Sequence, residues 1–510
     1  MIDKPNVVLP LAYSYNERGV QGYTHAVTNG EDQRKVNCFY EPVKNNMTGK
    51  GTLTLSKRPG ASICTATLGF STQVPYAVCR NLNVGIDFPP VLFAVTNTGT
   101  HIIASHKTGA NGSVTTVASL GGGTAYIPRF AQVVQRYSAG VGEENFLVQA
   151  VQPEFGQRVF YTTNANGAWN EITDVDFPTI IAGKIEQIDG YLFAFDASGF
   201  IRNSDLNSLD AWTATNYKAK EIALDRAVGL AKQGNQLLAF GDTSVEVFYN
   251  AGGTTGSPLG RLSHIANNIG MVNTYRTGQN IGSGMDYYCT IGKRIYFVGR
   301  ETGALNSVGL YSYEGGQFTR ASTTYTDKIL SDSRDTIFSV NAISVLGQEA
   351  VSICFTVPGD ATQRWLMFFP EWKEWFEWNS TIFSSVGNGQ WFVGTSDKNR
   401  VYSITDSDLW QDNGTSYQWL TQFRLPSNGG SRNRMTMYGL DADTDTSANS
   451  ITVDVSDDDC QSFYTLGSLD LTRDRKMGFR GGSFRKRHVR LSATDARPKR
   501  VYQFLARVDG

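Results

Sequence analysis

Carboxylates gather near the C-terminal end of the chain, where they could bind a metal ion. Asp441, Asp443 and Asp445 alternate with other residues, as the first ligands of a calcium-binding loop do. That loop needs Gly at its sixth position for a sharp turn and a bidentate carboxylate at its twelfth. This sequence has Thr446 and Thr452 there. The spacing therefore does not support a calcium site.

A second acidic stretch reads SDDDCQSF over residues 456–463. Its aspartates are typical of the Asp-box turn of sialidase-like propellers. However, Cys460, Ser462 and Phe463 stand where that turn prefers Gly, Thr and Trp. An ordinary β-turn rich in Asp is the better interpretation.

The other templates for chemistry fail at single positions. A phosphate-binding loop ending at Gly49-Lys50 would need Gly at position 44 and Ser or Thr at position 51, and the sequence has Lys44 and Gly51. The five histidines include no pair at metal-ligand spacing, and no nucleophile signature is present. We therefore expect no catalytic residues, no cofactor and no metal. A hydrolase assembled from carboxylates on different blades stays open, because such a site leaves no local motif.

The six cysteines show no CxxC pattern, so we interpret them as buried thiols. The N-terminus lacks the basic and apolar segments of a signal peptide. No apolar run reaches the roughly 20 residues that span a bilayer. We expect the chain to fold in a cytoplasm, with no stable membrane insertion.

The run WLMFFPEWKEWFEWN, residues 365–379, is the densest aromatic segment. Trp372, Trp375 and Trp378 could form a platform for stacking sugars, but such clusters more often bury apolar area between sheets. Together with similar residues in other strands, they give a set of candidate blade-core residues: Trp212, Phe240, Phe248, Trp375 and Trp378.

Bulk composition favours a folded protein rich in strands and turns. The chain has 510 residues, 40% of them hydrophobic and 18% charged, with 52 Gly and a formal net charge of −1. That charge argues against a protein held to nucleic acid by an overall positive field. It does not exclude passive contact with DNA.

A strand–turn–strand pattern recurs along the middle of the chain. GNQLLAFGDTSVEVFYNAGG, residues 234–253, is its clearest copy, and glycines introduce related pairs at positions 190, 234, 292, 347 and 389. A weak period near 40–50 residues suggests propeller blades of about four strands. A pair of stacked sandwiches with coincidental spacing is the alternative. We predict an all-β fold, a β-propeller core with additional N-terminal and C-terminal β-rich domains: residues 1–85, a docking or platform region; 86–415, the propeller; and 416–510, a sandwich-like domain with a basic tail.

Charge is divided unevenly within the last domain. Residues 441–460 contain no Lys or Arg, whereas residues 471–510 hold twelve Lys and Arg against three Asp. Such asymmetry is typical of a solvated face or of an electrostatic docking surface. The candidate partner-docking residues are Arg485, Lys486, Arg487, Arg490, Lys499 and Arg500.

Three stretches carry a resemblance to a known family: NSLDAW within residues 203–221, VGLAKQGNQLLAFGDTSVEVFYNAGG at 228–253, and NCFYEPVKNNMTGKGTLTLSKRPG at 37–60. LTQFR at 420–424 leads similarly into a basic-tailed last domain. In this order, the segments resemble the tail-hub family of short-tailed bacteriophages, also labelled packaged-DNA stabilisation protein or tail nozzle.

The resemblance implies a structural virion protein in the tail, assembled in the host cytoplasm. It implies a homo-oligomeric, hexameric ring beneath the portal and adaptor proteins. That ring closes the DNA channel, retains packaged DNA, conducts double-stranded DNA at ejection and carries tail fibre or spike proteins. The alternative from another class is a carbohydrate-binding or glycoside-cleaving β-propeller.

Overall fold

The computed structural model describes the strands, an α-helix and some of the connections between them. The described residues are 7–11, 34–44, 51–63, 77–80, 91–97, 100–107, 114–122, 127–138, 141–152, 156–162, 169–223, 225–253, 255–265, 267–272, 288–302, 308–333, 337–356, 363–380, 383–386, 391–394, 401–403, 409–425, 432–443, 447–473 and 477–509.

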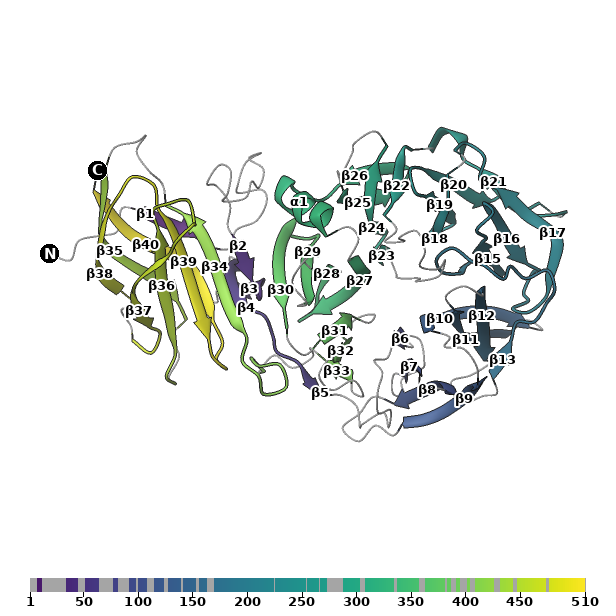
Figure 1. The fold of residues 1–510 in the computed structure, drawn as a ribbon, viewed down its shortest axis with the longest axis horizontal. Helices are drawn as coiled ribbons and strands as arrows, with labels where there is room; N and C mark the ends of the chain where they lie inside the picture. Colours follow the sequence, from purple (N-terminus) through teal and green to yellow (C-terminus); the bar gives the residue numbers. More distant parts are fainter. Residues whose placement is uncertain are drawn as a thin grey trace.

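Antiparallel sheets follow one another around a ring in chain order (Figure 1). The described strands make seven blades, which confirms the predicted β-propeller. Blades 1 to 3 are β6 (Ala77–Arg80), β7 (Val91–Asn97), β8 (Thr100–Lys107), β9 (Val114–Gly122); β10 (Ile127–Ser138), β11 (Val141–Gln152), β12 (Gly156–Thr162), β13 (Trp169–Glu171); and β14 (Glu186–Ile188), β15 (Tyr191–Phe195), β16 (Phe200–Ser204), β17 (Trp212–Ala219).

The second half of the ring continues the pattern and adds the helix. Blades 4 to 6 are β18 (Ala227–Gln233), β19 (Gln236–Gly241), β20 (Val245–Asn250), β21 (Leu259–Arg261); β22 (Ile269–Met271), β23 (Tyr288–Ile291), β24 (Arg294–Glu301), β25 (Val308–Glu314), β26 (Gln317–Arg320); and β27 (Ile337–Val345), β28 (Gln348–Thr356), β29 (Gln363–Phe369), β30 (Glu374–Asn379). The 3₁₀ turn η2 (Ser263–Ile265) follows blade 4, and α1 (Thr324–Asp332) lies between blades 5 and 6.

The repeated glycines of the sequence occupy one topological position. Gly190, Gly234, Gly292 and Gly347 lie at the turns that lead into β15, β19, β24 and β28 of blades 3, 4, 5 and 6. All four have positive φ, between 56° and 84°. Glycine takes this conformation without the steric cost that a Cβ brings. The fifth, Gly389, lies outside the described residues.

Blades 4 and 5 bury both of their faces, which explains their nearly continuous apolar strands. In β19, Leu238 and Phe240 pack toward blade 5, whereas Leu237 and Ala239 pack toward blade 3. Successive side chains of a strand point to opposite faces, so one strand supplies two neighbouring cores. The same alternation divides β24 between blades 4 and 6.

A strand from the N-terminal part of the chain completes blade 7. This blade contains β31 (Phe383–Val386), β32 (Trp391–Gly394) and β33 (Val401–Ser403). Its fourth strand is β5 (Ser62–Ile63), which pairs antiparallel with β33 in the register Tyr402↔Ile63. Because β5 precedes blade 1 and belongs to blade 7, it ties the end of the ring to its beginning.

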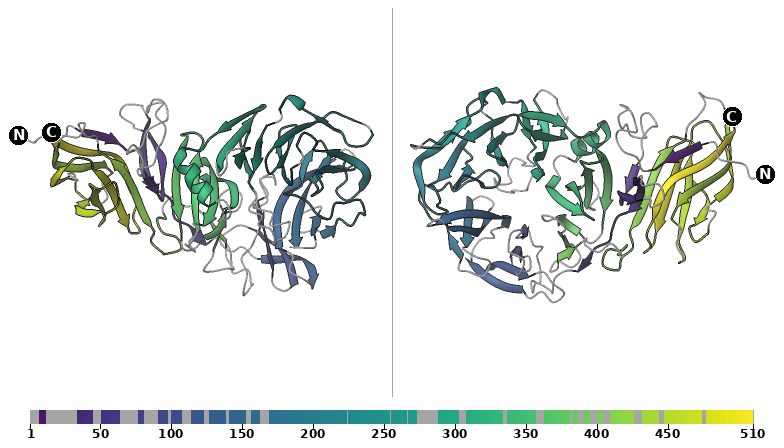
Figure 2. Two further views of the ribbon diagram at one scale, coloured as in Figure 1. Left: turned by 45° about the horizontal axis from the view of Figure 1, so that its top comes forward. Right: turned by 180° about the vertical axis from the view of Figure 1, so that it is seen from behind.

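The C-terminal part forms a β-sandwich beside the propeller, and all views place the two side by side along the long axis (Figures 1 and 2). One sheet has the order β3-β4-β40-β35-β38, with β1 also pairing β40; the other contains β34, β39, β36 and β37. The strands are β1 (Val7–Pro10), β3 (Cys38–Lys44), β4 (Gly51–Lys57), β34 (Gln418–Arg424), β35 (Asn433–Ala442), β36 (Ser450–Ser456), β37 (Tyr464–Asp470), β38 (Met477–Phe484), β39 (His488–Thr494) and β40 (Arg500–Asp509).

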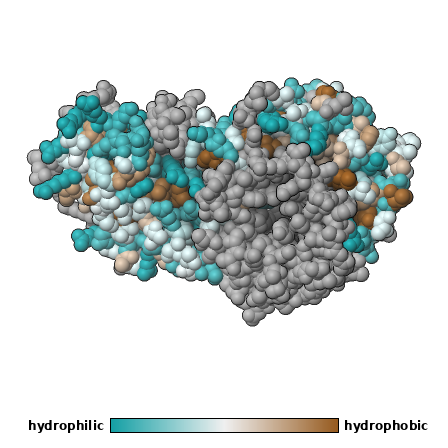
Figure 3. Space-filling view, viewed as in Figure 1, coloured by the Kyte–Doolittle hydropathy of each residue, from teal (hydrophilic) through white to brown (hydrophobic). Residues whose placement is uncertain are grey.

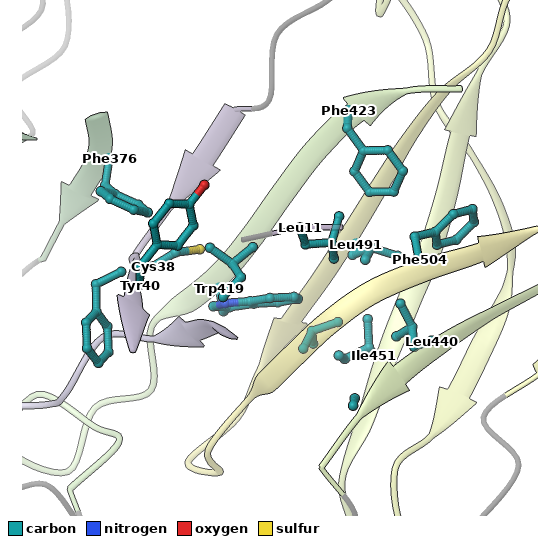
Figure 4. Close-up of a cluster of buried hydrophobic side chains, with 14 of the residues drawn as sticks. Leu11, Cys38, Tyr40, Phe376, Trp419, Phe423, Leu440, Ile451, Leu491 and Phe504 are labelled. Carbon is teal, nitrogen blue, oxygen red and sulfur yellow. The ribbon is translucent and has the colours of Figure 1, made fainter. Parts of the chain in front are cut away.

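Aromatic and aliphatic side chains from both sheets fill the sandwich (Figure 4). Phe423 of β34 and Phe504 of β40 meet with ring centroids 5.2 Å apart. Tyr40 of β3 packs edge-to-face on Phe376 of blade 6, also at 5.2 Å. The hydrophobic core therefore continues from the sandwich into the propeller.

Strand β2 (Arg34–Val36) joins the propeller to the sandwich through main-chain hydrogen bonds. It pairs parallel with β30 of blade 6 and antiparallel with β34, so that blade 6 and one sheet of the sandwich form one nine-stranded sheet. The described strands of residues 1–85 thus lie in the sandwich, in this link and in blades 1 and 7, rather than in one separate region. The bounds predicted for the three domains stay a prediction.

Candidate functional site

The six predicted docking residues divide into exposed and internally paired groups. Arg485 and Lys486 are exposed in the turn between β38 and β39. Arg487 is fully buried, with Nε and Nη2 bonded to the Asp457 carboxylate at 2.7 and 2.6 Å. Lys499 is also fully buried, and its Nζ lies 2.8 and 2.9 Å from the Asp495 carboxylate oxygens.

The last two candidates are partly buried in cross-strand pairs. Arg490 donates to Asp454 at 3.1 and 2.9 Å, and Arg500 donates to Glu41 at 2.8 and 3.2 Å. Four of the six cations are therefore neutralised by carboxylates of the same chain, and the surface charge falls mainly to Arg485 and Lys486. Docking itself stays a prediction, and the sequence could not separate the two groups because their acidic partners are up to 459 positions away.

Four of the five predicted blade-core residues lie between neighbouring blades, each in a different interior cluster. Trp212 packs between blades 2 and 3 with its ring 5.0 Å from that of Phe177. Phe248 lies between blades 3 and 4 and Phe240 between blades 4 and 5. Trp375 lies between blades 5 and 6, where its Nε1 donates to the carbonyl of residue 321 at 3.3 Å.

Trp378 lies between blade 6 and the sandwich instead of between two blades. It is 3% exposed, and its Nε1 donates to the Cys38 carbonyl at 2.8 Å. Trp372 is half-buried and donates to Gln348. Since Trp375 and Trp378 are buried in separate clusters, the three rings do not form an exposed sugar-stacking platform.

The motif Gly241-Asp242-Thr243-Ser244, central to the resemblance, surrounds a carboxylate that sequence reasoning missed. Asp225 accepts hydrogen bonds from the main-chain N–H groups of Thr243 and Ser244 at 2.7 and 2.9 Å, and from both hydroxyls. Lys220 donates to it as well. A Cβ at Gly241 would collide with this carboxylate, so glycine is required there.

Electrostatics at Asp225 favour the charged form. Burial alone would raise its pKa, but the hydrogen bonds from Lys220 and Thr243 outweigh burial and lower the pKa. Glu246 of β20 makes a second bridge, because it accepts from the N–H of Ile222 at 2.7 Å and pairs with Arg261 at 2.9 Å. The motif therefore fastens the connection between blades 3 and 4 to blade 4.

Polar side chains that are hydrogen-bonded to one another link blade 6 to the sandwich, at what we call the junction. We use this name for β2 and the buried polar side chains that join blade 6 to the sandwich. Its centre is Asn37, which donates to Asn379 of blade 6 at 2.6 Å and to the Gln418 carbonyl of the sandwich at 2.7 Å. The junction contains Arg34, Lys35, Asn37, Tyr40, Arg58, Tyr325, Glu374, Glu377, Asn379, Ser380, Asp412 and Tyr417.

Three ion pairs stabilise the junction. The Lys35 Nζ atom lies 2.8 Å from a carboxylate oxygen of Glu374, and both side chains are at most 1% exposed. Arg34 bonds Glu377 at 2.9 Å, and Tyr325 donates to the same carboxylate at 2.5 Å. Burial would raise the pKa of Glu377, but the charge and hydrogen bond of Arg34 and the bond from Tyr325 together lower it.

Arg58 forms the third pair, with Asp412, and lies 3.7 Å from the centre of the Tyr417 ring. Its neighbour Lys57 is buried against the same ring, and burial lowers the pKa of Lys57 to about 8. These contacts hold two domains in one orientation. No local motif could reveal them, because each partner lies more than 300 positions away in sequence.

Metal ions in proteins are held by donor sets of His, Cys, Asp and Glu side chains. The part of the chain that is described contains no group of three or more His, Cys, Asp or Glu residues placed to hold a metal ion. In the SDDDCQSF turn, Asp458 accepts from the Ser456 hydroxyl and the Ser462 N–H, which is the geometry of a closed polar turn. Cys38, Cys289 and Cys354 are buried free thiols, and burial raises the pKa of Cys38 and Cys354.

A family model that matches the propeller shows which family the chain belongs to. The family model described as "Bacteriophage P22 Gp10, beta-propeller" matches residues 95–351, just over half of the chain. The chain belongs to this family. Membership in the Gp10 family makes it a bacteriophage structural protein, and thus a virion component. No helix in the described ranges has the length and apolar character needed to cross a membrane.

Other comparisons add only distant likenesses. No curated protein matches the chain. Exo-beta-1,3-galactanase from Phanerochaete chrysosporium is 10% identical with a TM-score of 0.31, over 88% of this chain and 100% of that one. The computationally designed Ika8 protein is 8% identical with a TM-score of 0.35, over 67% and 99%. Human WBSCR16 is 8% identical with a TM-score of 0.36, over 66% and 89%. Likeness at this level carries no argument about function.

Proposed function

We propose that this Gp10-family chain is a subunit of the tail hub or nozzle. In this role its ring closes the DNA channel below the portal and adaptor, retains packaged DNA and conducts it at ejection. The observation that carries the proposal is the family match over the propeller together with a junction that makes blade 6 and the sandwich one continuous sheet. We also propose that the chain has no catalytic role.

Mechanical stiffness is what the architecture offers to such a role. The ring of blades is closed by β5, and the sandwich is held by β2 and three ion pairs with interior partners. A subunit that holds DNA under pressure must transmit force without bending between its domains. The pairing of β2 with β30 and β34, together with the ion pairs, provides this, because bending the joint would break these interactions together.

The charge balance fits passage of DNA. With a net charge of −1, the chain has no overall positive field that would retain phosphates. The proposed partners are other copies in a hexameric ring, portal and adaptor proteins, tail fibre or spike proteins, and the passing duplex. Arg485 and Lys486 are the candidate docking cations that remain exposed.

Particles assembled without this chain test the proposal. We expect such particles to package DNA and then lose it, so that the genome becomes sensitive to added nuclease. Supplying the chain in trans should restore retention. The proposal would be wrong if particles that lack this chain kept their genome and a complete tail. Cleavage of a saccharide by the purified chain would also contradict it.

A further inference from the structure

The end of the sandwich that faces away from the propeller carries a group of unneutralised cations. Arg480 lies within β38, Arg485 and Lys486 lie in the turn that follows it, and all three are exposed. Arg432 and Arg434 lie beside them, because Asn433 pairs with Phe484 and Arg434 with Ser483. We call these five cations, with Phe479, the basic end. Phe479 is 71% exposed, which is unusual for so large an apolar side chain.

Nearby acids leave the basic end positive. Asp457 is neutralised by Arg487, and Asp509, opposite Arg434, pairs with Arg507. Asp458 accepts only from the neutral groups of Ser456 and Ser462, so it keeps its charge, as does Asp459, and these two charges oppose five cations. Within the described ranges, the five cations of the basic end form no ion pair. Their charge is therefore available to a partner.

The opposite end of the molecule has the complementary character. Asp174 and Asp176 accept the N–H groups of Trp212 and Ala214 in β17, both at 3.1 Å. Asp205 accepts from Thr213 at 2.9 Å and from Asn216. These donors are neutral, and as far as the structure is described no cation pairs with the three carboxylates. Three negative charges therefore surround one edge strand.

Exposed apolar side chains lie among these acids. Val175, between Asp174 and Asp176, is 94% exposed, and Leu206, next to Asp205, is 57% exposed. Figure 3 shows apolar surface on this rim of the propeller, near the place of β17 in Figure 1. We call Asp174, Val175, Asp176, Asp205 and Leu206 the acidic rim.

We propose that the basic end of one copy docks on the acidic rim of the next. Both surfaces combine charge of one sign with exposed apolar groups, and they lie at opposite ends of the long axis, where Figure 1 shows β38 and β17. We choose a second copy of this chain as the partner, because each copy carries both surfaces, with opposite charge and with exposed apolar groups on each. Opposite charges would set orientation and association rate, while burial of Phe479, Val175 and Leu206 would supply affinity.

This contact joins two different surfaces, so it repeats from copy to copy. Such a heterologous interface closes into a ring or continues as a filament. The inference rests on the proposed function for its ring, and adds to it the surfaces that meet. Each exposed ion pair contributes little by itself. We therefore expect the contact to depend on the whole set of charges and to weaken with salt.

Charge substitutions at each end test the inference by sedimentation and native mass measurement. The variant R485E/K486E lowers the basic end from five positive charges to a net of one, and V175K/L206K adds two cations to the acidic rim; neither Arg485 nor Lys486 makes an ion pair in the described residues. We expect each to weaken self-association about tenfold or more in about 50 mM salt, and less in about 500 mM salt. The quadruple variant should recover part of the association at low salt, because Glu then faces Lys, but not the part that is lost with the apolar contacts of Val175 and Leu206. K293E, an exposed change on blade 5, is the matched control.

Four results would overturn the inference: a wild-type chain that stays monomeric at about 100 µM in low salt, association that ignores both double variants, a quadruple variant with no recovery, or a basic end that binds duplex DNA in place of a second copy. Genome retention by particles is a separate measurement. A chain that associates as expected but does not affect retention would contradict only the proposed function.

Discussion

Arg58 and Asp412 lie 354 positions apart and form a two-pronged ion pair across the junction, with nitrogen–oxygen distances of 2.9 and 2.6 Å. Their side chains are 2% and 3% exposed. Arg58 follows β4 of the sandwich, and Asp412 precedes β34 and also accepts from Ser380 at the end of blade 6. One carboxylate thus joins the N-terminal segment, the propeller and the sandwich.

Removing one partner should destabilise the protein strongly. We expect Asp412→Ala to cost about 3–5 kcal/mol, since a guanidinium would stay buried without its counter-charge. The double variant R58M/D412L should cost less than D412A alone, because it buries no unpaired charge. Denaturant titration measures both, with Arg473→Ala, at an exposed pair, as the control. Equal losses for all three would contradict a role of the buried pair.

Asp225 should be essential to the Gly-Asp-Thr-Ser motif. Asp225→Ala leaves two main-chain N–H groups without an acceptor and removes the counter-charge of Lys220, so we expect a loss of about 2–3 kcal/mol. The matched variant Asp242→Ala removes a neighbouring, more exposed carboxylate and should have a small effect. Proteolysis near residues 220–226 gives a local readout, since the connection should loosen only in the Asp225 variant. An unchanged cleavage pattern would argue against the fastening role.

Trp212 should contribute to the packing of blades 2 and 3. Trp212→Ala removes a ring that is 4% exposed, and we expect a loss of about 3–5 kcal/mol in the free energy of unfolding. Leu206→Ala, at a side chain that is 57% exposed, is the control and should change stability little. The comparison fails if the two variants unfold at the same denaturant concentration.

Acid should destabilise the sandwich in the range where histidine titrates. His488 is buried, neither ring nitrogen has a hydrogen-bond partner in the described residues, and burial lowers its pKa below 6.5. The negative charge of Asp459 raises the pKa of His488, whereas the positive charges of Arg424 and Lys486 lower it further. A lowered pKa means that stability is complete above pH 6.5 and falls as pH decreases toward the folded-state pKa.

His488→Gln and His488→Leu should both flatten this part of the stability curve, measured by denaturant midpoint from pH 7.5 to pH 5 (about the range in which histidine titrates). A second loss should follow at lower pH in all variants. This second loss comes from Glu377, because its pKa is lower in the folded state than the ordinary value of 4.5. Its contribution to stability is complete above pH 4.5 and decreases as the pH falls below that value. A wild-type curve that is flat down to pH 5 would refute the assignment to His488.

The sequence alone determined the class of fold and the repeated unit. Alternating apolar residues and turn glycines are local signals, and Gly190, Gly234, Gly292 and Gly347 all occupy the same turn of their blades. Residues such as Phe240 and Trp375 could be assigned to an interior, because large apolar rings are seldom exposed. The resemblance of the Gly-Asp-Thr-Ser motif to a phage family could also be recognised from the sequence, because its residues are contiguous in the chain.

Only the tertiary structure decided which charges are available and how the domains join. Arg487 and Arg485 are two positions apart in one basic run, yet one is buried against Asp457 and the other faces solvent. Whether a cation is neutralised depends on a partner brought close by folding, and the spacing of residues along the chain does not encode it. The same holds for β2 and β5, short strands whose role is set by the edges of distant sheets that they complete.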